Sequence, residues 1–356
     1  MVTIDSKRPN RQFWKGKRVL VTGDAGFKGS WLVNWLHLLE SEIFGVDKNN
    51  LQPLMNSYPI DSSYHHVNCD LALQEIEISK FPEKFDFIFH LAAQPIISTS
   101  HENPIKTIQN NLMSSLNLLG KYTAAAPQPV FVMASTDKVY KEISEFHLHV
   151  ESDQLGGQDP YSLSKVFVEN FLELETLVRP SKLVIVRSGN VIGGGDFSKN
   201  RLVPDIFRSW SSKKPLTVRN PEAVRPWLSV IDSLNGYLLA AENAYEAKGK
   251  YFESFNFAPH FDDHFSVQMM IELSLNELNC SQMKSLIGKN ISFKERKILA
   301  LDANKARKSL GWEPTSGAHR TIKMAMDWYR LHADKHPGYL ITRNQIEEFM
   351  KGGLLL

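Results

Sequence analysis

Cysteine is scarce in this sequence, whose 356 residues include only Cys69 and Cys280. Two cysteines cannot support a disulfide-dependent scaffold, and such sparing use is typical of a reducing compartment. The N-terminal stretch MVTIDSKRPNRQFW is polar and lacks the apolar core of a secretory signal. No run approaches the roughly 18 apolar residues that a membrane span needs. These absences predict a cytoplasmic protein without a membrane partner.

A surplus of one charge is also missing, because 41 Lys and Arg residues are balanced by 39 Asp and Glu residues. No basic arm or stripe dominates, so the sequence does not favour a nucleic-acid partner. Twelve histidines are present, but the only adjacent pair, His65 and His66, has no Cys or Glu at ligand spacing. We therefore expect no structural metal.

What the sequence does contain is a regular alternation of short apolar runs and longer helical patterns. The apolar runs lie at 18–23, 42–47, 85–93, 129–135 and 182–190. They are nearly continuous, as in strands that are buried on both faces. Strands that alternate with helices of ten or more residues indicate βαβ units. The expected fold class is α/β, with a Rossmann-type doubly wound parallel sheet.

The pattern changes after Asn190, where a glycine-rich and then basic stretch leads into a new helical segment. We expect a dinucleotide-binding domain over residues 12–190, with return segments at about 228–258. Residues 191–227 and 259–356 would form a smaller C-terminal α/β domain that binds the substrate.

A glycine pattern lies between the first strand and the first long helix. Gly23, Gly26 and Gly29 are spaced G-x-x-G-x-x-G. Such glycines permit a tight turn, close approach of the backbone to a pyrophosphate and close packing of helix on strand. The helix N-terminus then offers free N–H groups to the phosphates. This arrangement predicts a dinucleotide cofactor.

An acidic residue follows at the distance that a ribose contact requires. Asp47 ends the second strand, where a carboxylate binds the adenosine ribose and repels a 2′-phosphate, which favours NAD over NADP. The alternative is an Asp that only starts a turn, and the adjacent Lys48 leaves room for NADP. Asp70 is a candidate partner for the adenine amino group, or a loop residue.

Tyr161 and Lys165 form a Y-x-x-x-K pair in DPYSLSKVFVENF. Four residues apart on a helix, they share one face. A phenol has a free pKa near 10, and a neighbouring ammonium together with a nicotinamide cation would lower that pKa. Tyr161 could then accept a proton from a hydroxyl whose carbon gives up a hydride. The pair by itself is common on solvated helix faces, and its position after a strand and loop favours the catalytic interpretation.

Three further candidates end the strand at 129–135. Thr136 would point into the ligand crevice and share the hydroxyl proton with Tyr161. Asp137 and Lys138 offer a second acid/base pair, which an oxidoreductase does not need and a dehydratase does. In isolation an Asp-Lys dipeptide more often marks an exposed turn.

In combination these features resemble the extended short-chain dehydrogenase/reductase family. Finer marks are most similar to the CDP-glucose 4,6-dehydratases, and one of them is Lys28, where related epimerases have a branched apolar residue. The matching segments run from about residue 12 to 330 and include TGDAGFKG, HLAAQP, TDK, LGGQDPYS, RSGNVIGGGD, RNPEAVRPW and LDANKARKSLGW.

The resemblance implies a reaction on a nucleotide sugar with NAD as cofactor. Tyr161, with Lys165 and Thr136, would deprotonate the hydroxyl at sugar carbon 4. Lys138 would remove the proton at carbon 5, for which its amine must be neutral. Asp137 would protonate the departing 6-hydroxyl. The hydride taken up by NAD from carbon 4 would return to carbon 6.

The resemblance also implies the remaining binding residues and the assembly state. We expect a homodimer or a dimer of dimers, formed through two helices around Asn111 and Tyr161. The expected cofactor contacts add Phe27, Leu71 and Ala92, and the expected substrate contacts are Gln94, Asn111, Asn190, Arg201, Arg219 and Arg225.

Two departures from the CDP-glucose pattern leave the nucleotide and the sugar open. KEISEFHLHVES stands between Tyr140 and Asp153, where an acidic, Trp-containing stretch is common, and Leu228 and Ser229 replace a common Gln-His pair. The alternatives are a nucleotide-sugar 4-epimerase or reductase, or a dehydratase of another nucleotide hexose. A non-catalytic NAD-binding regulatory protein belongs to a different class and shares the fold.

Overall fold

A seven-stranded parallel sheet forms the centre of the molecule. The computed structural model describes residues 6–49, 63–73, 81–122, 128–144, 147–218, 220–280, 285–287 and 299–352. The strand order β11-β7-β5-β4-β1-β2-β3 reverses direction between β1 and β4, as in a doubly wound nucleotide-binding sheet. The predicted fold class is confirmed. The strands are β1 (Arg18–Thr22), β2 (Glu42–Asp47), β3 (Tyr64–Asn68), β4 (Phe87–His90), β5 (Val130–Thr136), β7 (Lys182–Ser188) and β11 (Tyr251–Phe257).

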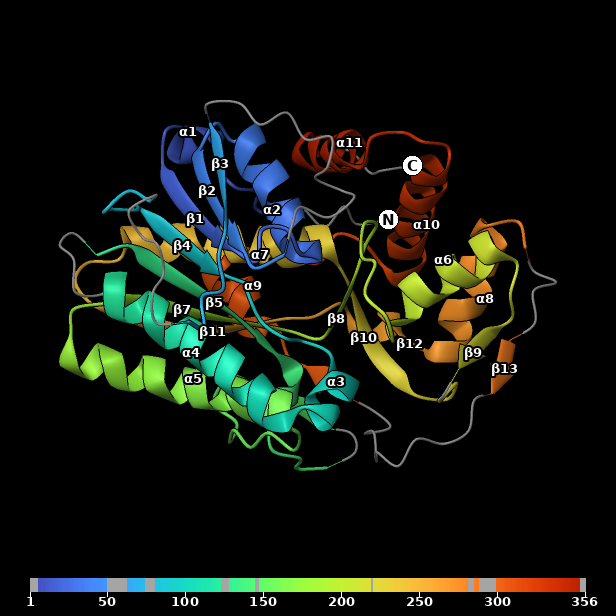
Figure 1. Cartoon of the computed structure of the whole chain (residues 1–356), viewed down its shortest axis with the longest axis horizontal. Coiled ribbons are helices and arrows are strands. Elements are labelled where there is room, and N and C mark those ends of the chain that lie inside the picture. The colour runs from blue at the N-terminus through green and yellow to red at the C-terminus, as the bar shows by residue number, and fades with distance from the viewer. Residues whose placement is uncertain are drawn as a thin grey trace.

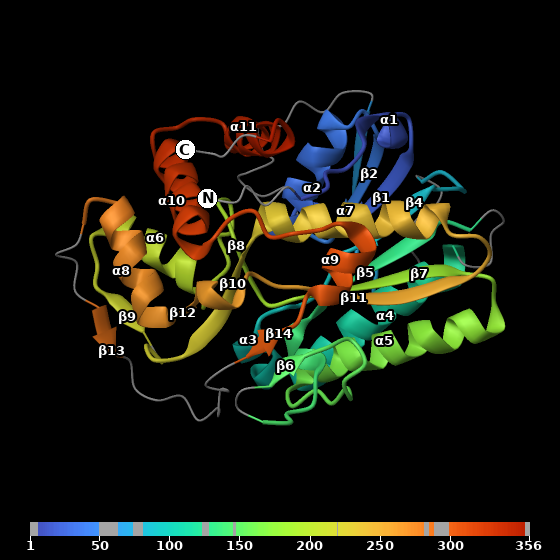
Figure 2. The same cartoon turned by 180° about the vertical axis from the view of Figure 1, so that it is seen from behind.

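Helices cover both faces of this sheet. One face carries α2 (Phe27–Leu38) and α7 (Val230–Glu246), and the other carries α4 (Pro104–Tyr122) and α5 (Pro160–Val178), as Figures 1 and 2 show. The central strands β1, β4, β5 and β7 are almost wholly buried, with β1 and β4 exposing only Arg18. The sheet therefore separates two apolar clusters, one on each face, which explains the continuous apolar runs in the sequence.

Local sequence fixes the start of α5, which carries Tyr161 and Lys165. Asp159 caps the helix by accepting hydrogen bonds from the backbone N–H groups of Tyr161 and Ser162, at 2.9 and 3.0 Å. The Asp159 backbone N–H in turn donates a hydrogen bond to the Ser162 hydroxyl, which completes a capping box. Pro160 occupies the first helical position. The segment DPYS thus places Tyr161 in the first turn of the helix.

A second lobe lies beside the sheet, at the right of Figure 1. Its three-stranded sheet has β10 (Val224–Ser229) between β8 (Asn190–Ile192) and β12 (His264–Ser266). Helices α6 (Leu202–Ser212), α8 (Val267–Glu277) and α10 (Ala318–Ala333) complete the lobe. We propose that this lobe corresponds to the expected substrate domain of residues 191–227 and 259–356, and that 12–190 with 228–258 forms the other domain.

Shorter elements connect the two parts. Two small parallel pairs join β9 to β13 and β6 to β14. The other described elements are α1 (Arg11–Trp14), α3 (Ile97–Glu102), the 3₁₀ turn η2 (Asp137–Val139), β6 (Leu148–His149), β9 (Leu216–Val218), the 3₁₀ turn η3 (Phe261–Asp263), β13 (Ser285–Ile287), β14 (Ala300–Leu301), α9 (Asn304–Leu310) and α11 (Gly338–Met350).

The last helix, α11, packs against α2. The ring of Phe349 meets the fully buried ring of Trp35 edge to face, with centroids 5.4 Å apart. The Arg8 side chain donates a hydrogen bond of 2.8 Å to the Phe349 carbonyl. The end of the described chain therefore closes over the helix that follows the glycine turn. Across the described ranges, no helix combines the length and the apolar character needed to cross a membrane.

Candidate active site

A cavity of about 1100 Å³ opens at the carboxyl ends of the central strands. Ligands of doubly wound sheets bind in this position, outside the point where the strand order reverses. The cavity continues into the second lobe at Asn190, Arg201 and Arg225. Residues that end or directly follow five central strands line it, namely Gly23, Asp47, Leu91, Thr136 and Gly189.

The glycine turn makes a close-packed cradle at one end of the cavity. Gly23 adopts a positive φ of 73°, and a Cβ there would lie 2.9 Å from the backbone nitrogen of Ala92. A Cβ on Gly29 would lie 2.0 Å from the Gly23 carbonyl oxygen. Gly26 caps α2 without a side chain of its own, so the N–H groups of the first turn face the cavity. This cradle fits the pyrophosphate of a dinucleotide.

Replacing Gly29 with alanine should lower the free energy of unfolding by about 1–3 kcal/mol, because the added Cβ forces the turn away from α2. It should also weaken NAD binding. Thermal denaturation and an NAD titration would measure the two effects. Gly120→Ala on α4 is the matched control, since a Cβ there meets nothing within 4 Å. An unchanged melting temperature for Gly29→Ala would contradict the close packing of this turn.

The other expected cofactor residues line the same cavity. Asp47 sits at the end of β2, where its Oδ1 accepts hydrogen bonds from the backbone and side-chain nitrogens of Asn49, at 2.8 and 3.0 Å. Burial raises the pKa of this carboxyl group. Asp70 accepts a 3.0 Å hydrogen bond from the Ala72 backbone, which agrees with the alternative that it is a loop residue. The remaining expected contacts in the cavity wall are Phe27, Leu71 and Ala92.

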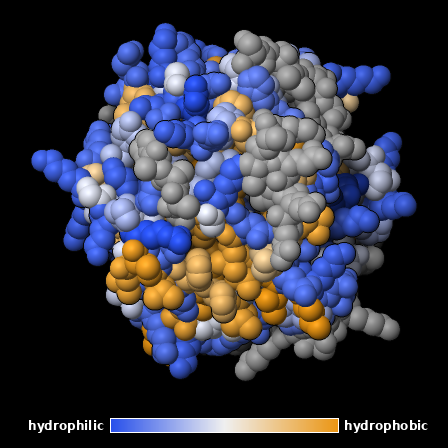
Figure 3. All heavy atoms as spheres, turned by 60° about the vertical axis from the view of Figure 1, so that its left-hand side comes forward, coloured by the Kyte–Doolittle hydropathy of each residue, from blue (hydrophilic) through white to orange (hydrophobic). Residues whose placement is uncertain are grey.

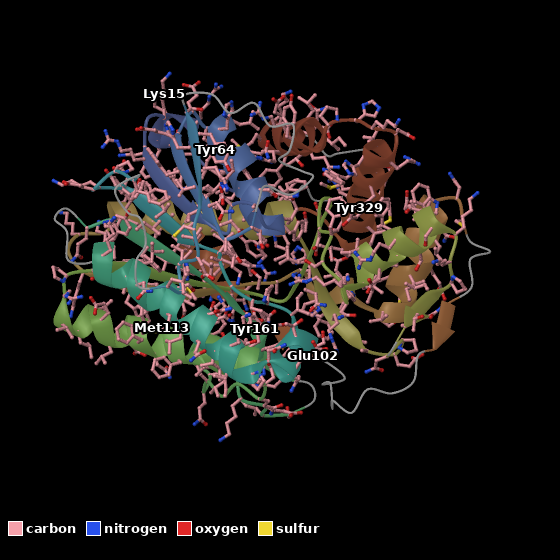
Figure 4. The ribbon with its side chains drawn as sticks, in the orientation of Figure 1. Lys15, Tyr64, Glu102, Met113, Tyr161 and Tyr329 are labelled. Atoms are coloured by element: carbon pink, nitrogen blue, oxygen red, sulfur yellow. The ribbon has the colours of Figure 1, made fainter. Side chains whose placement is uncertain are left out.

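Sequence reasoning missed a buried carboxylate beneath this end of the cavity. Asp24, inside the glycine turn, is fully buried, and its Oδ2 accepts a 2.7 Å bond from the Tyr64 hydroxyl and lies 2.7 Å from His66 Nδ1. Burial would lower the pKa of His66, but its contact with Asp24 raises it on balance. Gly45 leaves room for Asp24, since a Cβ there would lie 1.8 Å from its Oδ2. Tyr64 is labelled on β3 in Figure 4.

Tyr161 and Lys165 enter the middle of the cavity from α5, and Figure 4 labels Tyr161 at the end of that helix near α3. The Lys165 ammonium donates a 2.9 Å hydrogen bond to the Ala134 carbonyl of β5. Burial, together with the charge of Lys28, lowers the pKa of Lys165 to about 8, although Glu169 acts in the opposite direction. The pair therefore occupies one buried site, as the spacing predicts.

The acidity of Tyr161 differs from the sequence-based expectation. Burial raises the pKa of its phenol above the usual value, and the charge of Arg201 and a hydrogen bond with Thr136 only partly oppose this. The expected lowering depended on a nicotinamide cation as well as on lysine. The protein groups alone leave the phenol protonated at neutral pH.

Thr136, Asp137 and Lys138 end β5 and form η2. The Thr136 hydroxyl donates to Asp137 Oδ1 at 3.0 Å, and the Lys138 ammonium lies 3.2 Å from the same oxygen. Thr136 and Lys138 line the cavity, whereas Asp137 is fully buried directly behind them. Its Oδ2 has no hydrogen-bond partner among the described residues. A buried unpartnered carboxylate oxygen is costly, so it points to a reactive or ligand-binding role.

The expected substrate residues divide into two groups. Arg201, Arg225 and Asn190 line the cavity on the side of the second lobe, where guanidinium groups suit a diphosphate. Arg201 lies 3.8 Å from the carboxylate of Asp196, and Arg225 donates a 2.9 Å bond to the Val224 carbonyl. Arg219 lies outside the described residues.

Gln94 and Asn111 line the same cavity, but their amides hold the surrounding structure together. The Gln94 side chain bonds both the backbone nitrogen and the carbonyl of Ile96, at 2.6 and 3.1 Å. Asn111 accepts a 2.7 Å bond from the Gln94 backbone and donates a 2.9 Å bond to the Ser164 hydroxyl. These contacts fix the loop after β4 against α5 and so position the cavity wall.

This site combines a cradle for a pyrophosphate, a strand-end acid for a ribose and a buried tyrosine–lysine pair. On this fold the combination defines an extended short-chain dehydrogenase/reductase. The chain belongs to the GDP-mannose 4,6 dehydratase family, which matches residues 20–325. NAD is bound in two solved structures of this fold, a dTDP-glucose 4,6-dehydratase and a UDP-glucuronic acid 4-epimerase, and the glycine cradle and Asp47 of this chain fit the same cofactor.

Individual relatives agree with this assignment. The CDP-glucose 4,6-dehydratase of Salmonella typhimurium is 31% identical over 353 residues, which cover 96% of this chain and 98% of the relative. The fold is shared with the UDP-glucose 4-epimerase of Thermotoga maritima, at a TM-score of 0.77 and 23% identity over 89% of this chain and 99% of the epimerase. It is also shared with the NAD complex of dTDP-glucose 4,6-dehydratase from Bacillus anthracis, at a TM-score of 0.74 and 20% identity over 90% and 98%.

Proposed function

We propose that this chain is an NAD-dependent nucleotide-sugar 4,6-dehydratase, a hydro-lyase that converts CDP-glucose to CDP-4-keto-6-deoxyglucose. The observation that carries the proposal is the acid/base pair Asp137 and Lys138 beside the Tyr161–Lys165 pair. An epimerase needs only the tyrosine–lysine pair, because it breaks no carbon–oxygen bond. The similarity to a CDP-glucose 4,6-dehydratase over nearly the whole chain supports the choice of reaction and nucleotide.

The first pair acts on the hydroxyl at sugar carbon 4. Tyr161 takes the hydroxyl proton, and Thr136, which is hydrogen-bonded to the phenol, orients the same hydroxyl. Bound NAD supplies a hydride acceptor, and the positive charge of its oxidised ring favours the phenolate that the protein alone disfavours. The Lys165 ammonium, held by the Ala134 carbonyl, adds a second positive charge near the phenolate.

The second pair performs the elimination. Once carbon 4 is a ketone, the proton on carbon 5 becomes acidic, and the neutral amine of Lys138 removes it. The bond between carbon 6 and its hydroxyl oxygen breaks, and protonated Asp137 supplies the proton with which that oxygen leaves as water. The resulting double bond between carbons 5 and 6 would take back the hydride at carbon 6 and a proton from Lys138 at carbon 5, which gives the 4-keto-6-deoxy sugar. Arg201, Arg225 and Asn190, with Arg219 by resemblance, would hold the diphosphate and the sugar.

The test is to incubate the purified protein with CDP-glucose and, in parallel, with dTDP-glucose, GDP-mannose and UDP-GlcNAc. Mass spectrometry should show loss of one water from CDP-glucose and no net production of reduced cofactor. Water loss from another substrate would support the dehydratase reaction but show that CDP-glucose is not the substrate. An unchanged mass with inverted sugar stereochemistry would overturn the dehydratase in favour of an epimerase.

We also propose a cytoplasmic homodimer built on α4 and α5. Figure 3 shows an apolar patch on the side of the molecule where these helices lie. The spacing of Leu163, Phe167, Leu174 and Val178 places them on one stripe of α5, and Val178 is 72% exposed. The patch also includes Ile105 of α4 and Leu177. Pairing this patch with that of a second copy would bury both.

Replacing Phe167 and Leu174 together with glutamate should convert the dimer to a monomer, because four carboxylates would be buried at the interface. Sedimentation velocity at about 10 µM protein, a concentration at which a stable interface stays associated, would measure the change. Leu331→Glu, an exposed leucine on α10, is the control and should stay dimeric. A monomeric unmodified protein under these conditions would contradict this interface.

A further inference from the structure

The segment between Tyr140 and α5 contains a cluster of three metal-ligating side chains that the dehydratase chemistry does not use. His147, His149 and Asp153 each offer one donor atom, and these atoms lie within 4.8 Å of one another. His147 Nε2 is 2.6 Å and His149 Nδ1 is 3.1 Å from Asp153 Oδ2. We propose that this cluster is a binding site for a divalent transition-metal ion, with zinc as its simplest occupant.

Local structure explains how three residues so close in sequence converge. His147 and His149 are separated by one residue at β6, which directs their side chains to the same face. A tight turn then returns the chain, since the Asp153 backbone donates a 3.0 Å hydrogen bond to the Val150 carbonyl. The Val150 nitrogen in turn donates to Asp153 Oδ2 at 3.1 Å. The turn thereby aims the carboxylate at the two imidazoles.

The donor atoms are close enough together for one ion to bind all three. Zinc binds imidazole nitrogen and carboxylate oxygen at about 2.0–2.1 Å, which places tetrahedral donor atoms about 3.3 Å apart. From Asp153 Oδ2, His147 Nε2 is about 0.7 Å and His149 Nδ1 about 0.2 Å closer than this spacing, so both imidazoles would move away from the carboxylate when an ion enters. Each ring would present a lone pair to the ion and carry its proton on the other nitrogen, as metal-bound histidines do. Two histidines and one carboxylate leave a fourth position for water.

The surroundings hold the ligands in place, as the outer shells of metal sites do. The ring of His149 stacks on that of Tyr140, with centroids 4.7 Å apart and planes 4° apart. The Tyr140 hydroxyl contacts Asn256 and Arg187, each at 2.7 Å. The His149 carbonyl accepts bonds from Asn256 and Asp302, both of 2.9 Å. His149 is thus rigid, while the side chain of His147 is 30% exposed and leaves an entry route from solvent.

The position of this cluster gives the ion a structural effect. β6 pairs with β14, and Leu299, the residue before β14, lines the active-site cavity. Tyr140, against which His149 stacks, follows Lys138 by two residues. A bound ion would therefore brace a segment that connects the catalytic turn to the wall of the cavity. The inference concerns binding alone and does not depend on the proposed reaction.

The experiment is a titration of the full chain, freed of metal by a chelator, with zinc chloride by calorimetry. We expect one zinc ion per chain, bound with Kd of about 1 µM or below. His147→Gln and Asp153→Asn should each weaken binding by at least about tenfold. His65→Gln, which changes an exposed histidine of β3, is the control and should bind zinc normally. Cobalt chloride in place of zinc should give the visible absorption bands of a tetrahedral site.

Two results would overturn the proposal. One is binding of less than one equivalent at about 100 µM zinc, far above the expected Kd. The other is binding that is unchanged in both ligand variants, which would indicate adventitious association with surface histidines. Circular dichroism would check that the variants fold. His147→Gln carries the test if Asp153→Asn does not fold, because the His147 side chain is the most exposed of the three.

Discussion

Replacing Tyr161 with phenylalanine is expected to reduce kcat for the nucleotide sugar by about 10³-fold or more, the upper part of the range for loss of a general base. In the proposed reaction the phenol takes the hydroxyl proton at carbon 4, and no other step precedes that transfer. The change removes one oxygen from a side chain that is only 9% exposed, so its packing is retained. Mass-spectrometric rate measurements at saturating substrate would determine kcat.

Two controls separate catalysis from structure in this variant. Its melting temperature and NAD affinity should stay close to those of the unmodified protein, because Phe retains the ring and Lys165 keeps its bond to Ala134. Tyr122→Phe, at a buried tyrosine of α4 outside the cavity wall, should retain full activity. If Tyr161→Phe kept normal turnover, another group would have to remove the proton and the assignment of the site would be wrong.

Replacing Lys138 with methionine is expected to reduce water loss by about 10²–10⁴-fold, as for loss of a positioned base. Methionine keeps the length of the side chain and removes the amine that faces both the cavity and Asp137. In deuterium oxide the unmodified enzyme should leave one solvent deuterium at carbon 5 of the product, since that carbon loses and regains a proton. The variant should incorporate almost none, which NMR of the sugar would reveal.

Lys141→Met is the matched control for this second variant, because Lys141 is an exposed lysine three residues further along the chain. It should dehydrate the substrate and exchange carbon 5 normally. Normal exchange in Lys138→Met would assign the proton abstraction to another base. Loss of deuterium incorporation at carbon 5, with NAD binding intact, would support separate roles for the Tyr161–Lys165 and Asp137–Lys138 pairs.

The parts of the site that sequence reasoning predicted are those determined by local pattern. The glycine spacing predicted the turn, Asp47 follows from the end of a strand, and Tyr161 follows from its four-residue spacing to Lys165 after a strand and loop. Each signal lies within a few residues of the feature it predicts. Thr136 and Lys138 lie in the cavity for the same reason, since they end a recognisable strand.

The parts that it missed depend on contacts between distant segments. The hydrogen-bond partners of Asp24 come from β3, some forty residues away, and no local sequence pattern predicts these contacts. The side-chain amides of Gln94 and Asn111 are hydrogen-bonded to the backbone of neighbouring residues, which the spacing of residues in the sequence cannot show. The pKa of Tyr161 is raised because burial outweighs the nearby charges, and the extent of burial is known only once the fold is assembled.

The packing of α11 on α2 affects how the chain folds during its synthesis on the ribosome. Chains begin to fold from the N-terminus while synthesis continues. Here the central sheet lacks its edge strand until residue 257 is made, and Trp35 lacks the aromatic ring that packs on it until Phe349 emerges. The packing on α2, the helix that follows the glycine turn, is therefore completed only after residue 349 is made.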